Sequence, residues 1–256
     1  MLKEIIIAFQ SYAEAHQFIV KNKLWKWILI PGIIYMLLFI SGLFFFWKFS
    51  NEAVQFIFTS TGLMAWLNSM KESWLNLLVI VGQIIIVSVL LSFFFSVFKL
   101  LFLVFGSPVF AYLSEKTESI LKNVTYPFSL TQLGKDSLRG IQIAFRNFLW
   151  QTVYLLAIFL LSFIPLIGWI APLAALLVEC YYFGFSMLDY NSERNMLSVP
   201  ESIGLISNHK GLAIGNGIVF YLLHLVPVIG WLFAPSYAVV AATLSIFKAR
   251  QKQVII

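Results

Sequence analysis

Long stretches without a charged residue dominate the pattern along this chain. One covers residues 27–47 and a second covers residues 73–98, after which Lys99 interrupts an apolar continuation. A helix rises about 1.5 Å per residue, so each stretch can cross a hydrocarbon core about 30 Å thick. We therefore predict transmembrane helices over about residues 25–48 and 73–105.

Segments of mixed polarity flank these stretches. Apolar residues near a helical period in the first segment predict an amphipathic helix at the membrane surface over about residues 3–22; they are Ile5, Phe9, Tyr12 or Ala13, His16 and Ile19. A second mixed region predicts cytoplasmic helices over about residues 107–146. Ser107 is a suitable N-cap before Pro108, and Ser129 with Gln132 matches a capping box.

A nearly identical phrase stands in the middle of each of the two remaining uncharged runs. It is written IPLIGWIAP in the run 147–178 and VPVIGWLFAP in the run 211–247. Both runs are too long for one crossing of about 20 residues, and too short for two crossings with a turn, which need ~40. Proline lacks a backbone donor and the following glycine loosens the helix, so each phrase predicts a chain reversal.

These reversals predict two helical hairpins that penetrate the membrane only partly, over about residues 147–188 and 211–248. Pro172 and Pro235 are expected to open the returning arms. The predicted hairpin tips are formed by Pro165, Gly168 and Trp169 in the first copy, and by Pro227, Gly230 and Trp231 in the second.

The composition places the chain in a membrane. Hydrophobic residues make up 61% of it and charged residues only 11%, and the mean hydropathy is +0.90. A soluble domain carries about 25% charged residues. The predicted fold class is therefore an all-α integral membrane protein, with residues 1–256 forming a single domain.

The sequence carries no pattern that is typical of an enzyme. Its single cysteine, Cys180, has no partner for a disulfide and lies in an apolar stretch, where we expect it to pack. The three histidines are far apart, and no nucleophile with a base and no phosphate-binding glycine loop can be recognised. We expect no catalytic residues, no metal site and no cofactor.

The distribution of positive charge predicts the orientation. If both hairpins return to their side of entry, every Lys and Arg except Lys48 and Lys71 lies on the face that holds the two termini. By the positive-inside rule this face, with the N- and C-termini, is cytoplasmic. Anionic lipid headgroups are a sufficient partner for the net charge of +6, and nucleic acid is not needed.

Two groups of basic residues are candidates for binding anions. Lys21, Lys23 and Lys26 precede the first transmembrane helix, where they serve either as a cytoplasmic anchor or as a vestibule that attracts anions. Lys135, Arg139 and Arg146 recur at helical spacing and form one basic stripe. That stripe would contact lipid phosphate or solvent, or line a permeation path.

Other polar residues are expected to have structural roles. Glu179 lies in an apolar run, so it should face the protein interior near Arg146 or Lys210, or reach headgroup water if the hairpin is shallow. Asp189 suits a turn, because its side chain can bond to nearby backbone. We expect His224 to be a hydrogen-bonded core residue, and Glu115 and Glu118 to form ion pairs or hydrogen bonds on a solvated helix face.

Several segments follow one another in an order that resembles a known family. They are a basic stretch leading into ILIPGIIYMLLF, then SPVFAYLSEKTE with Pro108, Glu115 and Glu118, FIPLIGWIAP, LDYNSERN with Asp189, and LVPVIGWLFAPSYAVVAATL. This order is similar to that of the CysZ sulfate permease family, whose eukaryotic relatives are the etoposide-induced protein 2.4-like proteins, over about residues 20–248. The resemblance implies two long transmembrane helices, two partly penetrating hairpins, and dimers or larger oligomers in a bacterial inner membrane.

The resemblance also implies an anion site. The family's sulfate site lies before the first long helix, in a segment of Gly-Leu/Ile-Arg type that often has a second basic residue. The matching positions here are Lys23, Leu24, Trp25 and Lys26, with Lys21 just before them. Lysine replaces the glycine, which allows close backbone approach, and tryptophan replaces the first arginine, which offers a planar fork of donors.

We therefore expect an inner-membrane anion permease or channel of the CysZ type, with sulfate as the implied substrate. Basic side chains and unpaired N–H groups at helix N-termini would recognise the oxyanion. A non-transporting membrane scaffold, or an anionic-lipid-binding protein of the same fold, is the alternative. The replaced glycine and arginine favour this alternative somewhat.

Overall fold

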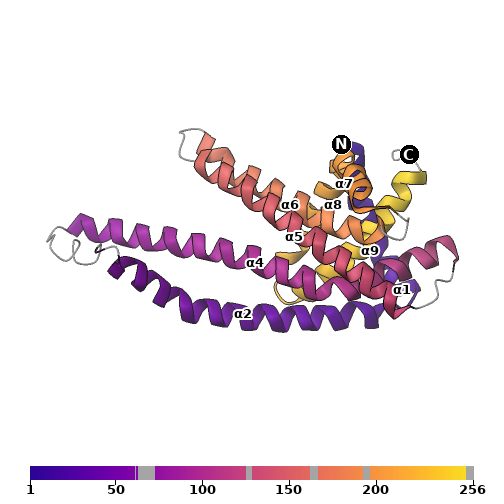
Figure 1. Cartoon of the computed structure of the whole chain (residues 1–256), viewed down its shortest axis with the longest axis horizontal. Helices are drawn as coiled ribbons and strands as arrows, with labels where there is room; N and C mark the ends of the chain where they lie inside the picture. Colours follow the sequence, from indigo (N-terminus) through magenta and orange to yellow (C-terminus); the bar gives the residue numbers. More distant parts are fainter. Residues whose placement is uncertain (61, 63–72, 125–128, 162–166, 193–196, 252–256) are drawn as a thin grey trace. The chain divides into compact units, whose positions relative to one another are not determined.

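The computed structural model describes residues 1–60, 62, 73–124, 129–161, 167–192 and 197–251. Within these ranges every regular element is an α-helix (Figure 1). The helices are α1 (Leu2–Lys21), α2 (Trp25–Ser60), α4 (Ser73–Lys122), α5 (Leu130–Leu161), α6 (Ile167–Ser192), α7 (Val199–Asn208), α8 (Lys210–His224) and α9 (Ile229–Gln251).

Among the described residues, five helical segments are long and apolar enough to cross a membrane: Trp25–Ser50, Val97–Lys122, Leu130–Leu161, Ile170–Ser192 and Ile229–Gln251. Many of their large apolar side chains are exposed, for example Leu156 on α5 and Leu173 on α6. An apolar surface of this extent is suited to lipid. The predicted class, an all-helical integral membrane protein, is therefore confirmed, whereas the division into full crossings and partly penetrating hairpins stays a prediction.

The chain forms two compact units. The second unit, Leu37–Leu101, contains the later part of α2 and the earlier part of α4. Aromatic rings join these two helices: Phe39 lies 5.2 Å from Phe98, and Phe46 lies 5.2 Å from Phe94, between ring centroids. Contacts of this kind stabilise a helix pair without any polar group.

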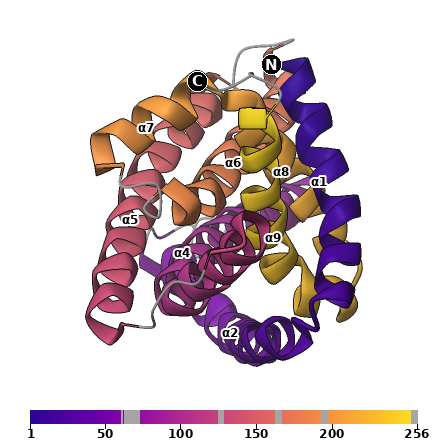
Figure 2. The same cartoon turned by 90° about the vertical axis from the view of Figure 1, so that its right-hand side faces the viewer.

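The first unit, Met1–Met36 with Phe102–Ile256, is organised around α8. This helix contacts α1, α6, α7 and α9 (Figure 2). A Cβ on Gly184 of α6 would lie 1.9 Å from the Ala213 carbonyl oxygen, and one on Gly217 would lie 2.0 Å from that of Cys180. The α6 and α8 backbones therefore touch, as small residues allow in membrane helix pairs.

Helix α1 forms where the sequence predicts it, and its buried face matches the prediction in part, since Tyr12 and Ile19 are buried as expected. Ala8 and Ala15 are fully buried, whereas Phe9, assigned to the apolar face, is 42% exposed, and His16 is exposed as well. The small alanines fit the close approach to α8, where a Cβ on Gly215 would lie 2.7 Å from that of Ala8. Close backbone packing, rather than side-chain size, decides which face is inside.

The start of α1 is joined to the start of α8. Glu4 is buried, and its carboxylate accepts a hydrogen bond from the Gly211 N–H at 3.0 Å and lies 2.9 Å from His209 Nδ1. A carboxylate at a helix N-terminus is stabilised by the unpaired N–H groups there. This contact fixes the N-terminal helix to the core of the first unit.

The predicted helix start at Ser107 is wrong, because α4 continues through Gly106, Ser107 and Pro108. A proline inside a helix removes the hydrogen bond to the carbonyl four residues earlier. Here that carbonyl belongs to Val104, and the Ser107 hydroxyl donates to it at 3.0 Å. The serine thus replaces the missing donor instead of capping a new helix.

The start predicted at Ser129 is confirmed, since the Gln132 N–H donates to the Ser129 hydroxyl at 3.3 Å. The Gln132 side chain does not complete a capping box but donates to Asp136 at 2.7 Å. From there α5 runs without interruption to Leu161, so the predicted cytoplasmic helix and the first hairpin arm are one helix.

Both repeated phrases lie near helix starts. Pro165 falls outside the described residues, and Gly168 and Trp169 belong to the first turn of α6. The prediction that Pro172 and Pro235 open helices is wrong. Both lie inside helices, α6 and α9, which begin earlier at Ile167 and Ile229.

The second phrase forms the tight connection between α8 and α9. Pro227 is exposed, Val228 has a left-handed φ of 63°, and the Ile229 N–H donates to the Pro227 carbonyl at 2.7 Å. A β-branched residue at this φ is strained. Gly230 follows, and a Cβ there would lie 1.9 Å from the Leu223 carbonyl oxygen. Trp231 donates its indole N–H to the His224 carbonyl at 3.2 Å across the turn.

Helix α7 begins with a capping box. The Ser198 hydroxyl and backbone N–H both donate to the Glu201 carboxylate at 2.7 Å. These hydrogen bonds lower the pKa of Glu201 below its ordinary value of 4.5. The capping box therefore fixes the start of α7 at Val199.

Candidate functional site

The predicted anion-binding residues lie where α1 ends and α2 begins. Lys21 is the last residue of α1, Lys23 has a left-handed φ of 54°, and Trp25 is the first residue of α2. The Lys23 N–H donates to the Val20 carbonyl at 3.3 Å and the Leu24 N–H donates to the Ile19 carbonyl at 3.1 Å. These two bonds form a Schellman motif, in which the left-handed position is usually glycine.

The side chains at this junction divide into an anchored group and an exposed group. Leu24 is buried, and the Trp25 ring lies 6.3 Å from His16 and 6.2 Å from Phe233, between centroids. Lys21, Lys23 and Lys26, in contrast, are exposed. Three ammonium groups therefore surround the N-terminal end of a 36-residue helix, whose dipole is positive there. The junction can attract an anion through charge, and its backbone is held in place by the Schellman hydrogen bonds, the buried Leu24 and the ring contacts of Trp25.

The three residues of the basic stripe predicted on α5 lie in different environments. Lys135 is exposed. Arg139 is bound to Asp189 of α6 through two nitrogens, at 3.1 and 3.5 Å, and donates to the Leu197 carbonyl at 2.5 Å. Arg146 is partly buried and donates to Asn147 Oδ1 at 3.0 Å. Only Arg139 of these three has a carboxylate partner within the residues that the structure describes.

Asp189 does not form the predicted turn, since it lies inside α6, which continues to Ser192. Its side chain is 2% exposed, and it accepts hydrogen bonds from Arg139 and from the Ser202 hydroxyl of α7. A buried carboxylate needs such partners. Asp189 therefore ties α5, α6 and α7 together, a structural role reached by different contacts from those expected.

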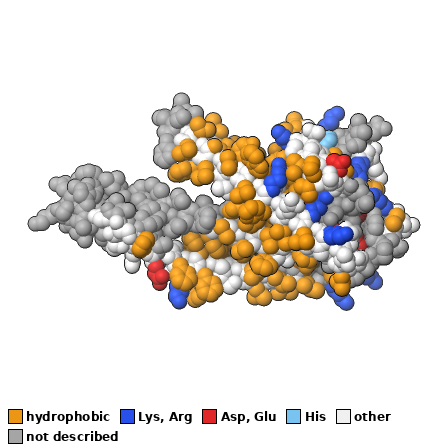
Figure 3. Space-filling model, viewed as in Figure 1, with side chains coloured by type: hydrophobic (Ala, Val, Ile, Leu, Met, Phe, Trp, Pro, Cys, Tyr) orange, Lys and Arg blue, Asp and Glu red, His pale blue; other side chains and the backbone are white. Residues whose placement is uncertain are grey.

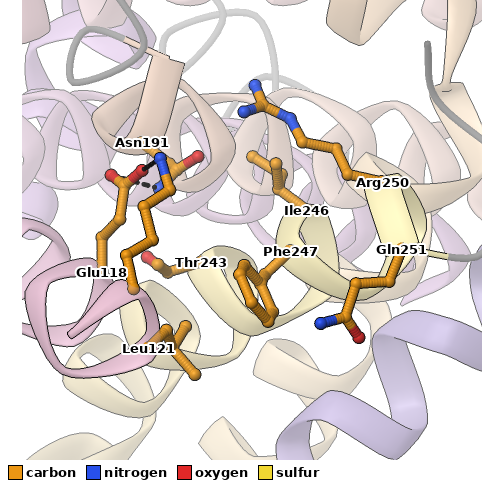
Figure 4. Close-up of a pocket in the computed structure, with 9 residues that line it drawn as sticks. Glu118, Leu121, Asn191, Thr243, Ile246, Phe247, Arg250 and Gln251 are labelled. Carbon is orange, nitrogen blue, oxygen red and sulfur yellow. Dashed lines mark hydrogen bonds and ion pairs between the residues drawn. The ribbon is translucent and has the colours of Figure 1, made fainter.

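Glu118 of α4 is also buried rather than solvated. It forms an ion pair with Lys122 at 2.5 Å and accepts a hydrogen bond from Asn191 at 3.1 Å. Figure 4 shows Glu118 and Asn191 on one side of a small pocket, which Thr243, Phe247 and Arg250 of α9 also line. Glu115 is partly buried, and Pro108 lies inside α4. Glu118 therefore joins α4 to α6 through Asn191.

Glu179 faces the interior, which confirms the first of the two alternatives for this residue. Its carboxylate accepts hydrogen bonds from Gln151 of α5 and, at 2.9 Å, from the Tyr221 hydroxyl of α8. Neither Arg146 nor Lys210 is among the partners identified. His224 is likewise part of the interior: its Nε2 lies 3.3 Å from the Tyr35 hydroxyl, and Phe220 stacks on its ring.

The contacts between α5 and α6 form a continuous row of polar pairs that sequence reasoning missed. We call this row the α5–α6 polar seam; its pairs are Arg139 with Asp189, Asn147 with Ser186, and Gln151 with Glu179. Arg139 and Gln151 are separated by about 18 Å of helix, at ~1.5 Å per residue. Spacings of four between Asn147 and Gln151, within an uncharged run, are the signal that could have indicated this seam.

Positive and apolar surfaces separate on the face drawn in Figure 3. Lys and Arg side chains gather toward the end of the first unit that holds both termini, and hydrophobic side chains cover α5 and α6 away from it. A span with one basic end and an apolar flank is typical of a membrane helix bundle.

Comparison with known proteins identifies the family of this chain. The model of the family described as sulfate transporter CysZ/etoposide-induced protein 2.4 matches residues 11–235, which is most of the chain. The chain belongs to this family.

Relatives within the family are similar over long stretches. A protein of Pseudomonas syringae pv. tomato named sulfate transporter CysZ is 28% identical over 173 residues, covering 67% of this chain and 68% of its own. A protein with the same name from Pseudomonas fluorescens is 28% identical over 185 residues, which cover 70% of this chain and 73% of that protein. One from Pseudomonas aeruginosa is 25% identical over 237 residues, or 92% of both.

The CysZ resemblance gives the left-handed φ at Lys23 a physical meaning. The sequence resemblance implies glycine at this position, and a Schellman motif favours glycine there because it has no Cβ. The present chain keeps the left-handed conformation with lysine, φ 54°. The geometry of the α1–α2 junction thus accommodates the replacement, at a cost of about 1 kcal/mol in backbone strain.

Proposed function

We propose that this chain is an inner-membrane permease or channel for sulfate. The observation that carries the proposal is the family match over residues 11–235, together with relatives that bear the name sulfate transporter CysZ. Five apolar helical segments support a position within the bilayer. The alternative, a scaffold that transports nothing, is not favoured by these relatives.

The proposed orientation places both termini in the cytoplasm. The positively charged side chains near the termini support it, because basic residues are retained on the cytoplasmic side. In this orientation α5 with α6, and α8 with α9, each enter from the cytoplasm and return to it. We propose that both pairs penetrate the bilayer partly, while the α2 and α4 segments cross it.

The proposed entrance for sulfate is the α1–α2 junction with Lys21, Lys23 and Lys26. Their exposed ammonium groups, next to the first turn of α2, provide charge for an oxyanion. Leu24 and Trp25 would hold the junction in place through their buried contacts. No cofactor or catalytic group takes part in this proposal, and the proposed partners are sulfate, anionic lipids and further copies of the chain.

Radiolabelled sulfate uptake into liposomes tests this proposal. The purified protein should give uptake well above that of empty liposomes, and Lys23→Ala/Lys26→Ala should lower the initial rate at low sulfate by about tenfold, since two charges leave the entrance. Lys116→Ala, an exposed lysine on α4, is the matched control and should behave as wild type. Uptake no greater than that of empty liposomes would exclude the permease function, whereas full uptake by the double variant would exclude only the proposed entrance.

A further inference from the structure

Arg139 and Arg146 lie on the same helix but are treated differently by the fold. The guanidinium of Arg139 is neutralised by Asp189, at 3.1 Å. For Arg146, no carboxylate lies within ion-pair distance in the described parts of the chain, 1–60, 62, 73–124, 129–161, 167–192 and 197–251. The one hydrogen bond that its guanidinium donates there goes to Asn147 Oδ1, which is neutral.

The surroundings of Arg146 hold its side chain in one place. Asn147 is buried at 2% exposure, and its amide nitrogen donates to the Ser186 hydroxyl of α6 at 3.0 Å. The Asn147 oxygen is therefore fixed toward the guanidinium. On its other side, the Arg146 Cζ lies 5.6 Å from the centre of the Phe185 ring, a cation–π contact.

This position is costly for a positive charge without an anion. Arg146 is only partly exposed, and the uncharged run of the first hairpin begins at the next residue. Desolvating a cation is unfavourable unless a negative group approaches it. Among the residues that the structure describes, only one hydrogen bond uses the five guanidinium N–H groups of Arg146, and a planar fork of such donors fits a tetrahedral oxyanion.

We propose that Arg146, oriented by Asn147, Ser186 and Phe185, is a binding site for a tetrahedral oxyanion beside the Asn147–Ser186 pair of the α5–α6 polar seam. Two sources supply this chemistry: free sulfate and the phosphate of an anionic lipid. The sulfate source rests on the proposed function, and it adds a guanidinium site to the lysine-rich entrance. Arg139, held by Asp189, is not part of the site.

Equilibrium binding of radiolabelled sulfate in nanodiscs of phosphatidylcholine alone tests the first source. Arg146→Gln should weaken sulfate binding about 10- to 100-fold, the loss expected for hydrogen bonds to a charged group. Arg146→Lys keeps the charge without the planar fork of donors, so its sulfate affinity should lie between those of wild type and Arg146→Gln. Lys116→Gln removes a charge from an exposed position and should bind as wild type. Thermal unfolding of each variant verifies that the fold is retained.

Native mass spectrometry with phosphatidylglycerol tests the second source. If the ligand is lipid phosphate, wild type retains bound phosphatidylglycerol, and Arg146→Gln loses one molecule of it while Lys116→Gln does not. Unchanged binding of both sulfate and phosphatidylglycerol in a folded Arg146→Gln protein would overturn the proposal. If wild type takes up sulfate normally but the Arg146→Gln protein binds both ligands unchanged, only the Arg146 site is excluded. If wild type takes up no sulfate, the proposed permease function is excluded.

Discussion

The two faces of α6 show how one helix can serve opposite purposes. Toward α8 it presents Cys180 and Gly184, which allow the two backbones to touch, and Phe183, whose ring stacks on Phe220 at 3.7 Å. Toward α5 it presents Glu179, Ser186 and Asp189, each joined to a polar side chain. The first face depends on the absence of side-chain volume, and the second depends on specific hydrogen bonds.

This difference predicts how each face responds to substitution. A change on the α8 face forces backbones apart, so its cost is steric and cannot be relieved by a second change nearby. A change on the α5 face leaves a polar group without its partner, so removing that partner as well should recover part of the loss.

The largest effect is expected for Gly184→Leu on the α8 face. Its Cβ would lie 1.9 Å from the Ala213 carbonyl oxygen, so α6 and α8 would have to separate. The free energy of unfolding should fall by about 3 kcal/mol or more, measured by SDS titration in mixed micelles. Gly134→Ala, where an added Cβ meets nothing within 4 Å, is the control and should be neutral or stabilising. Equal behaviour of the two variants would contradict the close packing of α6 on α8.

Asp189→Asn on the α5 face should be the next most severe. It leaves the Arg139 guanidinium, 11% exposed, without its counter-charge. Breaking a buried pair in this way costs about 3 kcal/mol. In a double-mutant cycle, Arg139→Gln combined with Asp189→Asn should destabilise the protein by less than the sum of the two single changes. Strict additivity in the same titration would argue against the ion pair.

Tyr221→Phe should have a moderate effect, because it removes one hydrogen bond to Glu179 and leaves the ring in place. Loss of a hydrogen bond to a carboxylate costs about 1.5 kcal/mol. Tyr154→Phe is the matched control, since the Tyr154 side chain is 49% exposed, and it should change stability little. A larger loss for Tyr154→Phe than for Tyr221→Phe would show that Glu179 does not need this donor.

Lys23→Gly should change the free energy of unfolding least, and it should stabilise the protein. Lys23 lies at the end of α1 and belongs to neither face of α6. Replacing the left-handed lysine by glycine should raise the free energy of unfolding by up to about 1 kcal/mol. Asn123→Gly, at the same φ of 54° after α4, is the comparison, and it should gain less because asparagine tolerates this conformation. Thermal unfolding of the two variants side by side measures the difference.

The features that the sequence predicted depend on local chemistry. Uncharged runs indicated membrane helices, Ser129 indicated a helix start, and Glu179 was placed inside because lipid disfavours a carboxylate. Each of these inferences uses residues that are neighbours along the chain. The helix start at Ser107 failed for a local reason as well: its hydroxyl can also satisfy the Val104 carbonyl and carry the helix past Pro108.

The spacing of Asn147 and Gln151 could indicate a polar face on α5, but the partners in the α5–α6 polar seam could not be predicted, because its pairs join residues distant in sequence. Arg139 and Asp189 are 50 residues apart, and nothing in the spacing of the basic stripe reveals that Arg139 is neutralised while Arg146 is not. Part of the buried face of α1 was missed for a related reason. It is chosen by glycines of α8, so Ala8 rather than Phe9 lies inside.

The backbone contact between α6 and α8 also restricts motion. Interfaces made of side chains can shift by changing rotamers, but main chains already in contact at Gly184 and Gly217 have no such freedom. During any opening and closing of the protein, α6 and α8 are therefore expected to travel as one rigid body. The displacement then falls on the boundary with α5, where individual side-chain hydrogen bonds can break and re-form.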